Sequence, residues 1–304
     1  MKIRFGIGLG TSNVLGEPSA FGPLVDLLEQ MRFDSLWISE RAAGPTLDPL
    51  AAIAFAAGRT SRLKFGTSVL VVPGRNPVLL AKELATIDAI SGGRLLPAFG
   101  LGTPDPREHE AFGVERGQRP SWFEEAVPLM RRLWQEDSVT HVGTRFRVTD
   151  FSLWPRPVGR MEVWLGGRSR TELDRTGRLS QGWLGAFQPP DEAGRSRVEI
   201  EAAAGRHGRT VDDDHFGTVL MYARDSVPAS VAARIARVSP AAAVSDVVPA
   251  GAGEFTDIVS RYVANGITKF VLVPVAKPAS WHEELAWLAP LVREFEGIEG
   301  TVGA

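Results

Sequence analysis

The sequence predicts an α/β protein in which eight parallel strands, each followed by a helix, close into a (β/α)8 barrel. Short apolar segments alternate with longer segments whose apolar residues recur at helical spacing, which is typical of βα units. About eight such units spread over the 304-residue chain, and a β/α barrel commonly takes about 250 residues as one domain. An open doubly wound sheet is the competing architecture, but the number and spread of the units favour closure.

The first half of the chain supplies four of the predicted strands. Leu24, Val25 and Leu28 recur at helical spacing, Pro49 suits the first turn of a helix, and Gly92 suits a helix end. We predict strands at residues 3–9, 35–39, 63–72 and 94–101, and helices at residues 21–31, 49–57, 77–90 and 121–135.

The second half continues the alternation and adds two insertions. We predict strands at residues 163–165, 182–185, 216–222 and 269–275, and helices at residues 171–179, 192–204, 255–264 and 281–295. Residues 138–151 alternate around Gly143 as a β-hairpin does. The Ala/Pro/Val-rich residues 226–253 show no clear period, so we expect an irregular insertion there. We expect one domain over residues 1–304.

Composition excludes several classes of function. The chain has no cysteine, which excludes disulfides, thiolate metal sites and a cysteine nucleophile, and we expect a cytoplasmic protein. The net charge of −2 argues against nucleic acid or an anionic membrane as a partner. Neither a signal peptide nor an apolar stretch of about 20 residues is evident. The five histidines lack HExxH spacing, so we predict no catalytic metal.

In a β/α barrel, function resides at the C-terminal ends of the strands. Gly166-Gly167-Arg168-Ser169 follows a predicted strand and precedes a helix. Glycines there let the backbone approach a ligand, and the free amides of the helix can bind a phosphate. A tight turn followed by an ordinary N-cap at Ser169 explains the same residues, and the sequence alone favours neither explanation.

Glycine pairs also end the first and fourth predicted strands. Gly8 and Gly10 lie at the end of the first strand, and Gly100 and Gly102 lie at the end of the fourth. Neither pair completes a GxGxxG dinucleotide fingerprint, so turn glycines are a sufficient explanation for each pair alone. Above a barrel, however, missing side chains leave room for a large planar cofactor.

Charged side chains near the predicted barrel mouth are candidates for catalysis. Glu40 and Arg41 end the second strand, where adjacent residues point to opposite faces and need not pair. Arg41 can stabilise an anionic cofactor or a substrate carboxylate, and His109, in the predicted loop after the fourth strand, can act as a general acid or base. A surface charge at a strand end is the weaker explanation for Arg41, whereas a solvated loop histidine explains His109 at least as well as a catalytic role. Among the tryptophans, we expect Trp37 in the core and Trp183 in a pocket wall.

Six stretches of the chain carry a resemblance to a known family. They are FDSLWISE at residues 33–40, RLKFGTSVL at 62–70, RNPVLLAK at 75–82, ISGGRL at 90–95, VWLGGRS at 163–169 and GW at 182–183. In this order they resemble the bacterial-luciferase-like superfamily of flavin- and deazaflavin-dependent oxidoreductases. The resemblance covers nearly the whole chain and is therefore more specific than any single motif.

The resemblance implies a barrel that binds FMN or the 5-deazaflavin coenzyme F420 at its C-terminal face, acts on a small molecule and forms a homodimer. In the family, the segment that matches Thr67-Ser68-Val69 contains a non-proline cis peptide that supports the cofactor ring, which places this bond at Ser68–Val69. The segment that matches residues 166–169 holds the cofactor phosphate. The expected cofactor-binding residues are Gly8, Ser39, Thr67, Ser68, Val69, Gly100, Gly102, Gly166, Gly167, Arg168 and Ser169.

One departure from the family and one loop refine this expectation. Many relatives have histidine where this chain has Arg41, and arginine does not shuttle protons near neutral pH. Residues 102–110 (GTPDPREHE) resemble the actinobacterial deazaflavin-dependent branch. We therefore expect an F420-dependent oxidoreductase that transfers a hydride between C5 of the deazaflavin and an organic substrate, with Glu40, Arg41 and His109 as candidate catalytic residues. An FMN-dependent monooxygenase and a cofactor-binding protein without turnover are the alternatives.

Overall fold

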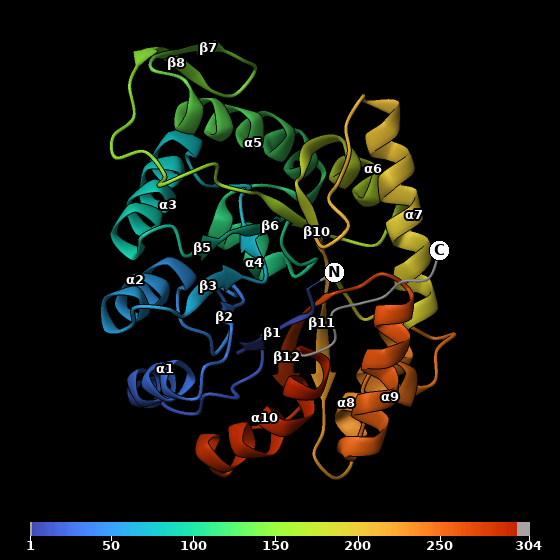
Figure 1. Cartoon of the computed structure of the whole chain (residues 1–304). Coiled ribbons are helices and arrows are strands. Elements are labelled where there is room, and N and C mark those ends of the chain that lie inside the picture. The colour runs from blue at the N-terminus through green and yellow to red at the C-terminus, as the bar shows by residue number, and fades with distance from the viewer. Residues whose placement is uncertain (1, 297–304) are drawn as a thin grey trace.

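A parallel sheet rolled into a barrel forms the centre of the molecule (Figure 1). The computed structural model describes residues 2–296, so the domain predicted over residues 1–304 extends beyond the described part at both ends. The strands of the sheet, in chain order, are β1 (Arg4–Gly8), β2 (Ser35–Ile38), β3 (Lys64–Thr67), β4 (Leu70–Val71), β5 (Leu95–Leu96), β6 (Ala98–Gly100), β9 (Trp164–Gly166), β10 (Gly182–Ala186), β11 (Phe216–Tyr222) and β12 (Lys269–Pro274).

Eight extended segments close the barrel, although two of them are each split in two. The strand predicted at residues 63–72 forms β3 and β4 on either side of the Ser68–Val69 bond, and the strand predicted at residues 94–101 forms β5 and β6 on either side of Pro97. Proline has no N–H to donate to the sheet, which explains the second interruption. β3 pairs with β2 and β5, β4 pairs with β6, and β6 pairs with β9. Each segment therefore has a neighbour on both sides, and the predicted (β/α)8 barrel is confirmed.

Helices cover the outside of this barrel (Figure 1). Local signals set their ends: α3 begins after Asn76, whose side chain accepts hydrogen bonds from the amides of Val78 and Leu79, and it ends at the left-handed Gly92. None of the helices in residues 2–296 is long and apolar enough to cross a membrane. The eight helices predicted from the sequence are present as α1 (Phe21–Gln30), α2 (Pro49–Arg59), α3 (Pro77–Ser91), α5 (Arg119–Gln135), α6 (Arg170–Leu179), α7 (Pro190–Arg206), α9 (Gly251–Ala264) and α10 (Trp281–Glu296).

Alternate residues of the strands build two layers of core. In β12, Phe270 packs in the cluster shared with the outer helices, whereas Val271 belongs to the cluster inside the barrel. Trp37 also lies in the inner cluster, as predicted. Trp183 is fully buried in the outer cluster, and its indole N–H donates to the carbonyl oxygen of Gly167 at 2.9 Å. The prediction that Trp183 lines a pocket is therefore wrong.

Two insertions extend the barrel. The predicted hairpin is present as the antiparallel pair β7 (Val139–Val142) and β8 (Arg147–Phe151). The segment predicted to be irregular, residues 226–253, instead contains the helix α8 (Ala229–Val238) and the single 3-10 turn η3 (Val244–Asp246). Only Ile235 of α8 is fully buried, but Val231, Ile235 and Val238 recur at helical spacing, a signal that the prediction missed among the surrounding alanines and prolines.

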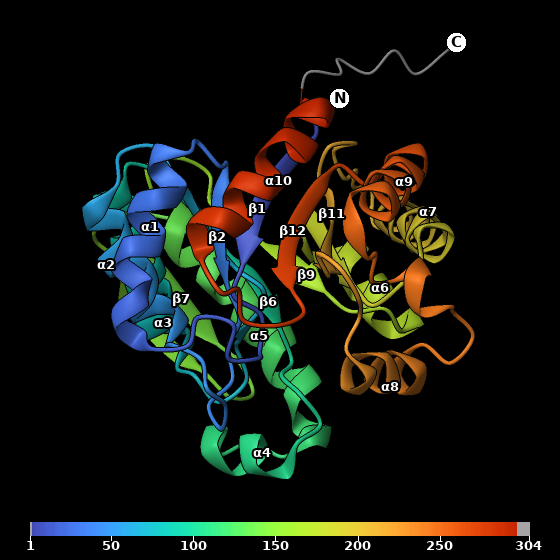
Figure 2. The same ribbon diagram turned by 90° about the horizontal axis from the view of Figure 1, so that it is seen from below.

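A short helix also replaces the loop predicted after the fourth strand. α4 (Pro106–Phe112) begins after Asp105, whose carboxylate accepts the amide hydrogen bond of Arg107, and ends at the left-handed Gly113. Figure 2 shows α4 and α8 at the same end of the molecule, where both extend beyond the barrel. A helix of two turns has too few residues for an apolar period to be evident in the sequence.

The side chain of Arg119 anchors α4 to the barrel. This residue is only 2% exposed, and its guanidinium donates to the carbonyl oxygens of Leu101 at 2.8 Å, Glu108 at 3.1 Å and Val114 at 3.1 Å. Leu101 follows β6, Glu108 lies on α4, and Val114 lies just beyond α4. One buried cation thus holds together three consecutive segments at the barrel mouth.

We expect Arg119→Met to lower the free energy of unfolding by about 3–5 kcal/mol, because three carbonyl groups lose their buried donor. Arg119→Lys should lower the free energy of unfolding nearly as much, since one ammonium group cannot reproduce the planar set of donors of a guanidinium group. The exposed Arg116 provides the control, and Arg116→Met should change the unfolding free energy by less than about 0.5 kcal/mol. Urea denaturation measures all three variants, and equal effects at positions 116 and 119 would contradict this role.

Candidate functional site

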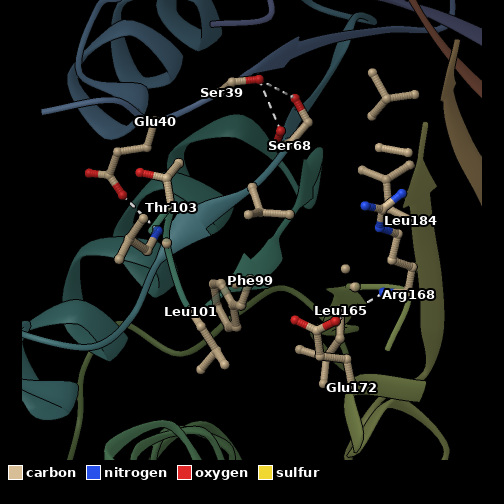
Figure 3. Close-up of a pocket in the computed structure, with 18 of the residues that line it drawn as sticks. Ser39, Glu40, Ser68, Phe99, Leu101, Thr103, Leu165, Arg168, Glu172 and Leu184 are labelled. Carbon is tan, nitrogen blue, oxygen red and sulfur yellow. Dashed lines mark hydrogen bonds between the residues drawn. The ribbon is translucent and has the colours of Figure 1, made fainter. Parts of the chain in front are cut away.

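A cavity of about 380 Å³ lies at the C-terminal ends of the barrel strands (Figure 3). Residues from the ends of β2, β4, β6, β9 and β10 form its walls, together with Thr11 after β1, Val219 of β11 and residues of α5 and α6. Cavities of this size hold small molecules and cofactors in many proteins. The cavity is therefore the candidate site.

Most of the wall is apolar. Gly166 contributes backbone alone, and a Cβ added there would lie 3.4 Å from Cγ1 of Val69 and from the carbonyl oxygen of Leu184. The non-proline cis peptide predicted at Ser68–Val69 is present, and both of its residues line the cavity. The apolar side chains of the wall are Val69, Val71, Phe99, Leu101, Phe123, Leu165, Leu184, Ala186, Phe187 and Val219. Such a wall suits a flat, largely apolar ring.

Four residues with hydroxyl groups, Thr11, Ser39, Ser68 and Thr103, interrupt the apolar wall. The hydroxyl of Ser39 donates to the carbonyl oxygen of Ser68 at 2.9 Å and lies 3.1 Å from the Ser68 hydroxyl. Oγ1 of Thr103 is buried and has no hydrogen-bond partner among the described residues. A buried hydroxyl without a partner is unfavourable, so a ligand that supplies a polar atom beside Thr103 is stabilised there.

Glu40 is the titratable residue that β2 contributes to the cavity. One carboxylate oxygen accepts the amide hydrogen bond of Val71 at 2.6 Å, and the other is paired with the guanidinium of Arg75. Burial raises the pKa of Glu40 above its ordinary value, although Arg75 and the Val71 amide oppose this rise. The pKa of Glu40 is therefore higher than that of a solvent-exposed glutamate.

Arg41 and His109 lie outside the cavity wall. Arg41 turns toward α4 and pairs with Asp105 and Glu108, each at 3.3 Å. The ring of His109, which belongs to α4 and not to a loop, contacts the carbonyl oxygen of Thr103 through Nε2 at 3.1 Å. Both side chains therefore connect α4 to the strand ends, and the structure brings neither to the cavity.

Nine of the remaining predicted residues line the cavity and three do not. Oγ1 of Thr67 is fully buried and both donates to and accepts from the backbone of Ala98, which ties the third strand to the fourth. Gly8 faces Val271 and Val273 of β12 inside the barrel. Ser169 caps α6. The predicted residues that do line the cavity are Ser39, Glu40, Ser68, Val69, Gly100, Gly102, Gly166, Gly167 and Arg168.

A carboxylate lies at the start of α6, where the sequence predicts a phosphate. Oε2 of Glu172 accepts hydrogen bonds from the amides of Arg168 at 3.1 Å and Ser169 at 2.9 Å, and from the Ser169 hydroxyl at 2.8 Å. Gly167 precedes them with a φ of 119°, which an L side chain rarely adopts. Burial acts to raise the pKa of Glu172, but the hydrogen bonds from Ser169 and Arg168 and the charge of Arg175 hold it below its ordinary value.

Sequence reasoning missed Thr103, Glu172 and Arg175, which also line the cavity. Glu172 had a visible signal, because a glutamate three residues after Ser169 is a capping box. Arg175 is 5% exposed and pairs with Glu124 of α5 at 3.1 Å, a contact across 51 residues that sequence spacing does not reveal. In residues 2–296, no group of three or more His, Cys, Asp or Glu side chains is arranged to hold a metal ion.

Curated proteins similar to this chain use two different cofactors. The F420-dependent glucose-6-phosphate dehydrogenase of Intrasporangium calvum is 32% identical over 227 residues, which are 67% of this chain and 67% of that protein. The FMNH2-dependent dimethylsulfone monooxygenase of Pseudomonas fluorescens is 32% identical over 173 residues, which are 55% of this chain and 46% of that protein. Other F420-dependent dehydrogenases are matched over 62% and 53% of their lengths.

Solved structures and a family model agree on the fold. An F420-dependent secondary alcohol dehydrogenase superposes with a TM-score of 0.79 at 18% identity, over 96% of this chain and all of that one. The monooxygenase RslO1 from Streptomyces bottropensis superposes with a TM-score of 0.78 at 20% identity, over 96% and 99% of the two chains. The model of the luciferase-like monooxygenase family matches residues 3–254. The chain therefore belongs to the luciferase-like monooxygenase family and is an oxidoreductase of that family.

Proposed function

We propose that this protein is a coenzyme F420-dependent oxidoreductase that transfers a hydride between the deazaflavin and a small organic substrate. The observation that carries the proposal is the apolar, glycine-containing cavity at the strand ends, with the unpaired hydroxyl of Thr103 in its wall. Similarity to F420-dependent dehydrogenases, in both sequence and fold, supports the deazaflavin.

The wall residues fit such a cofactor. Val69 and Leu165 offer apolar contacts for the faces of a ring, and Gly100 and Gly166 leave room beside it. Thr103 offers a hydroxyl to a polar atom at the ring edge or on the substrate. When bound, the deazaflavin supplies the hydride chemistry at C5. The protein then has to orient the ring and the substrate and to keep water away from them.

Glu40 is the residue that we propose to exchange a proton with the substrate. Oxidation of an alcohol releases a proton along with the hydride, so a base within reach of the hydroxyl assists the reaction. Its raised pKa makes Glu40 a stronger base than an ordinary carboxylate. The pairing with Arg75 and the Val71 amide holds the carboxylate in one orientation at the cavity wall.

An FMN-dependent monooxygenase is the second candidate, supported by similarity to the dimethylsulfone monooxygenase. Titration of the purified protein with coenzyme F420 and with FMN, followed by cofactor absorbance and fluorescence, separates the two. We expect stoichiometric binding of F420 and reduction of F420 by at least one member of a panel of primary and secondary alcohols. Tight FMN binding without F420 binding would overturn the proposal. Binding of F420 without turnover of any alcohol would favour a binding protein without catalysis.

Filling the proposed ring position should weaken cofactor binding strongly and leave the fold intact. A leucine at Gly166 would project into the cavity from the wall that Val69 and Leu184 share. We expect Gly166→Leu to weaken cofactor binding about a hundredfold or more, since the ring and the new side chain compete for one space. Gly205→Leu on α7, where an added Cβ meets nothing within 4 Å, is the control. Unchanged binding by the Gly166 variant would place the cofactor elsewhere.

The proposed base predicts a defined pH dependence. Because the pKa of Glu40 is raised, kcat/KM for alcohol oxidation should increase with pH through an inflection above the ordinary carboxyl value of 4.5. Glu40→Gln should remove this inflection and lower kcat by about a hundredfold, whereas Glu110→Gln, on the exposed part of α4, should change neither. If Glu40→Gln keeps the inflection in the pH profile of kcat/KM, another group accepts the proton from the alcohol.

A further inference from the structure

The amides at the start of α6 are already occupied by an anion of the protein itself. Three donors, the amides of Arg168 and Ser169 and the hydroxyl of Ser169, converge on Oε2 of Glu172 at 2.8–3.1 Å. A capping glutamate ordinarily bonds the amide of the N-cap residue alone. Here the same oxygen also takes the preceding amide and the hydroxyl, so all of the donors directed to this point share one carboxylate.

The side chain of Glu172 also covers the turn and reaches the cavity. A Cβ added at Gly167 would lie 2.5 Å from Cβ and 2.9 Å from Cδ of Glu172, so the glutamate folds back over this glycine. Glu172, Gly167 and Arg168 all line the cavity, and Figure 3 shows Glu172 beside Arg168, across from Glu40. The carboxylate is therefore in contact with the space that a ligand enters.

Two arginines line the cavity near this carboxylate, and the charge of Arg175 acts on it directly. Arg175 is buried and held by Glu124 at 3.1 Å, and Arg168 is held by the carbonyl oxygen of Val238 at 2.8 Å. Both arginines line the cavity, and the partners that hold their guanidinium groups do not include Glu172. An incoming phosphate would find favourable charge there, but its oxygens need the same three donors that Glu172 holds.

We propose that Glu172 competes with the cofactor phosphate for the amides of Arg168 and Ser169, and that it thereby sets how much the phosphate contributes to cofactor affinity. This inference rests on the proposed cofactor site. In the native protein the phosphate binds these donors only after the carboxylate withdraws. Consequently the native protein discriminates weakly between a flavin or deazaflavin that carries the phosphate and one that lacks it.

The test compares two pairs of probes: FMN with riboflavin, and coenzyme F420 with its deazaflavin chromophore lacking the phosphate. Dissociation constants are measured by fluorescence, without substrate. For whichever pair binds, flavins or deazaflavins, we expect the native protein to bind the phosphorylated and the phosphate-free member with affinities that differ by less than about tenfold. Glu172→Gln keeps the side-chain shape, removes the charge and should tighten the phosphorylated member about tenfold or more, while the other member changes less than about twofold.

Asp174→Asn is the matched control. It removes the same charge from the same helix, but the carboxylate of Asp174 pairs with Arg206 and makes no bond to these amides. If Asp174→Asn tightens the phosphorylated probe as much as Glu172→Gln does, net charge is responsible and the competition is refuted. A native protein that prefers the phosphorylated member by more than about a hundredfold also refutes it, and this measurement needs no variant. Failure of both ring types to bind would instead overturn the proposed cofactor site, and the competition with it.

Discussion

Hydrogen bonding between parallel strands is the constraint on which the rest of this structure depends. Each of the eight extended segments pairs with a neighbour on both sides, so the strands form a closed ring of segments that all end at one mouth. Ser39, Gly100 and Gly166 lie far apart in the sequence, yet they line one cavity for this reason. The members of the site therefore follow from barrel closure.

The charges around the cavity are already paired before any ligand arrives. Glu40 is held by Arg75 on one side, while Glu172 is held by the amides of α6 on the other. Buried or partly buried charges need such partners, because burial removes the water that would otherwise solvate them. A ligand in this site therefore exchanges one set of partners for another, and the strength of its binding depends on what it displaces as well as on what it contacts.

The elements of the barrel could be predicted because their signals are local. Helical spacing, capping residues and glycine stops are properties of short segments, and the eight helices follow them. Two further helices were not predicted from the sequence. α4 has only two turns, too few for an apolar period to be evident. In α8, Val231, Ile235 and Val238 do recur at helical spacing, but the alanines and prolines around them obscure this signal.

The sequence by itself determined the alternation of strands and helices, the glycine turns at the strand ends and the place of the cis peptide. These features depend on residues within a few positions of one another or on the family resemblance. Only the tertiary structure decided the directions of the charged side chains. Arg41 turns away from the cavity because α4 places Asp105 and Glu108 against it, 64 and 67 residues along the chain. Ion pairs form between the charges that the fold brings together. The spacing of two charged residues in the sequence does not reveal how far apart their side chains lie in the folded protein.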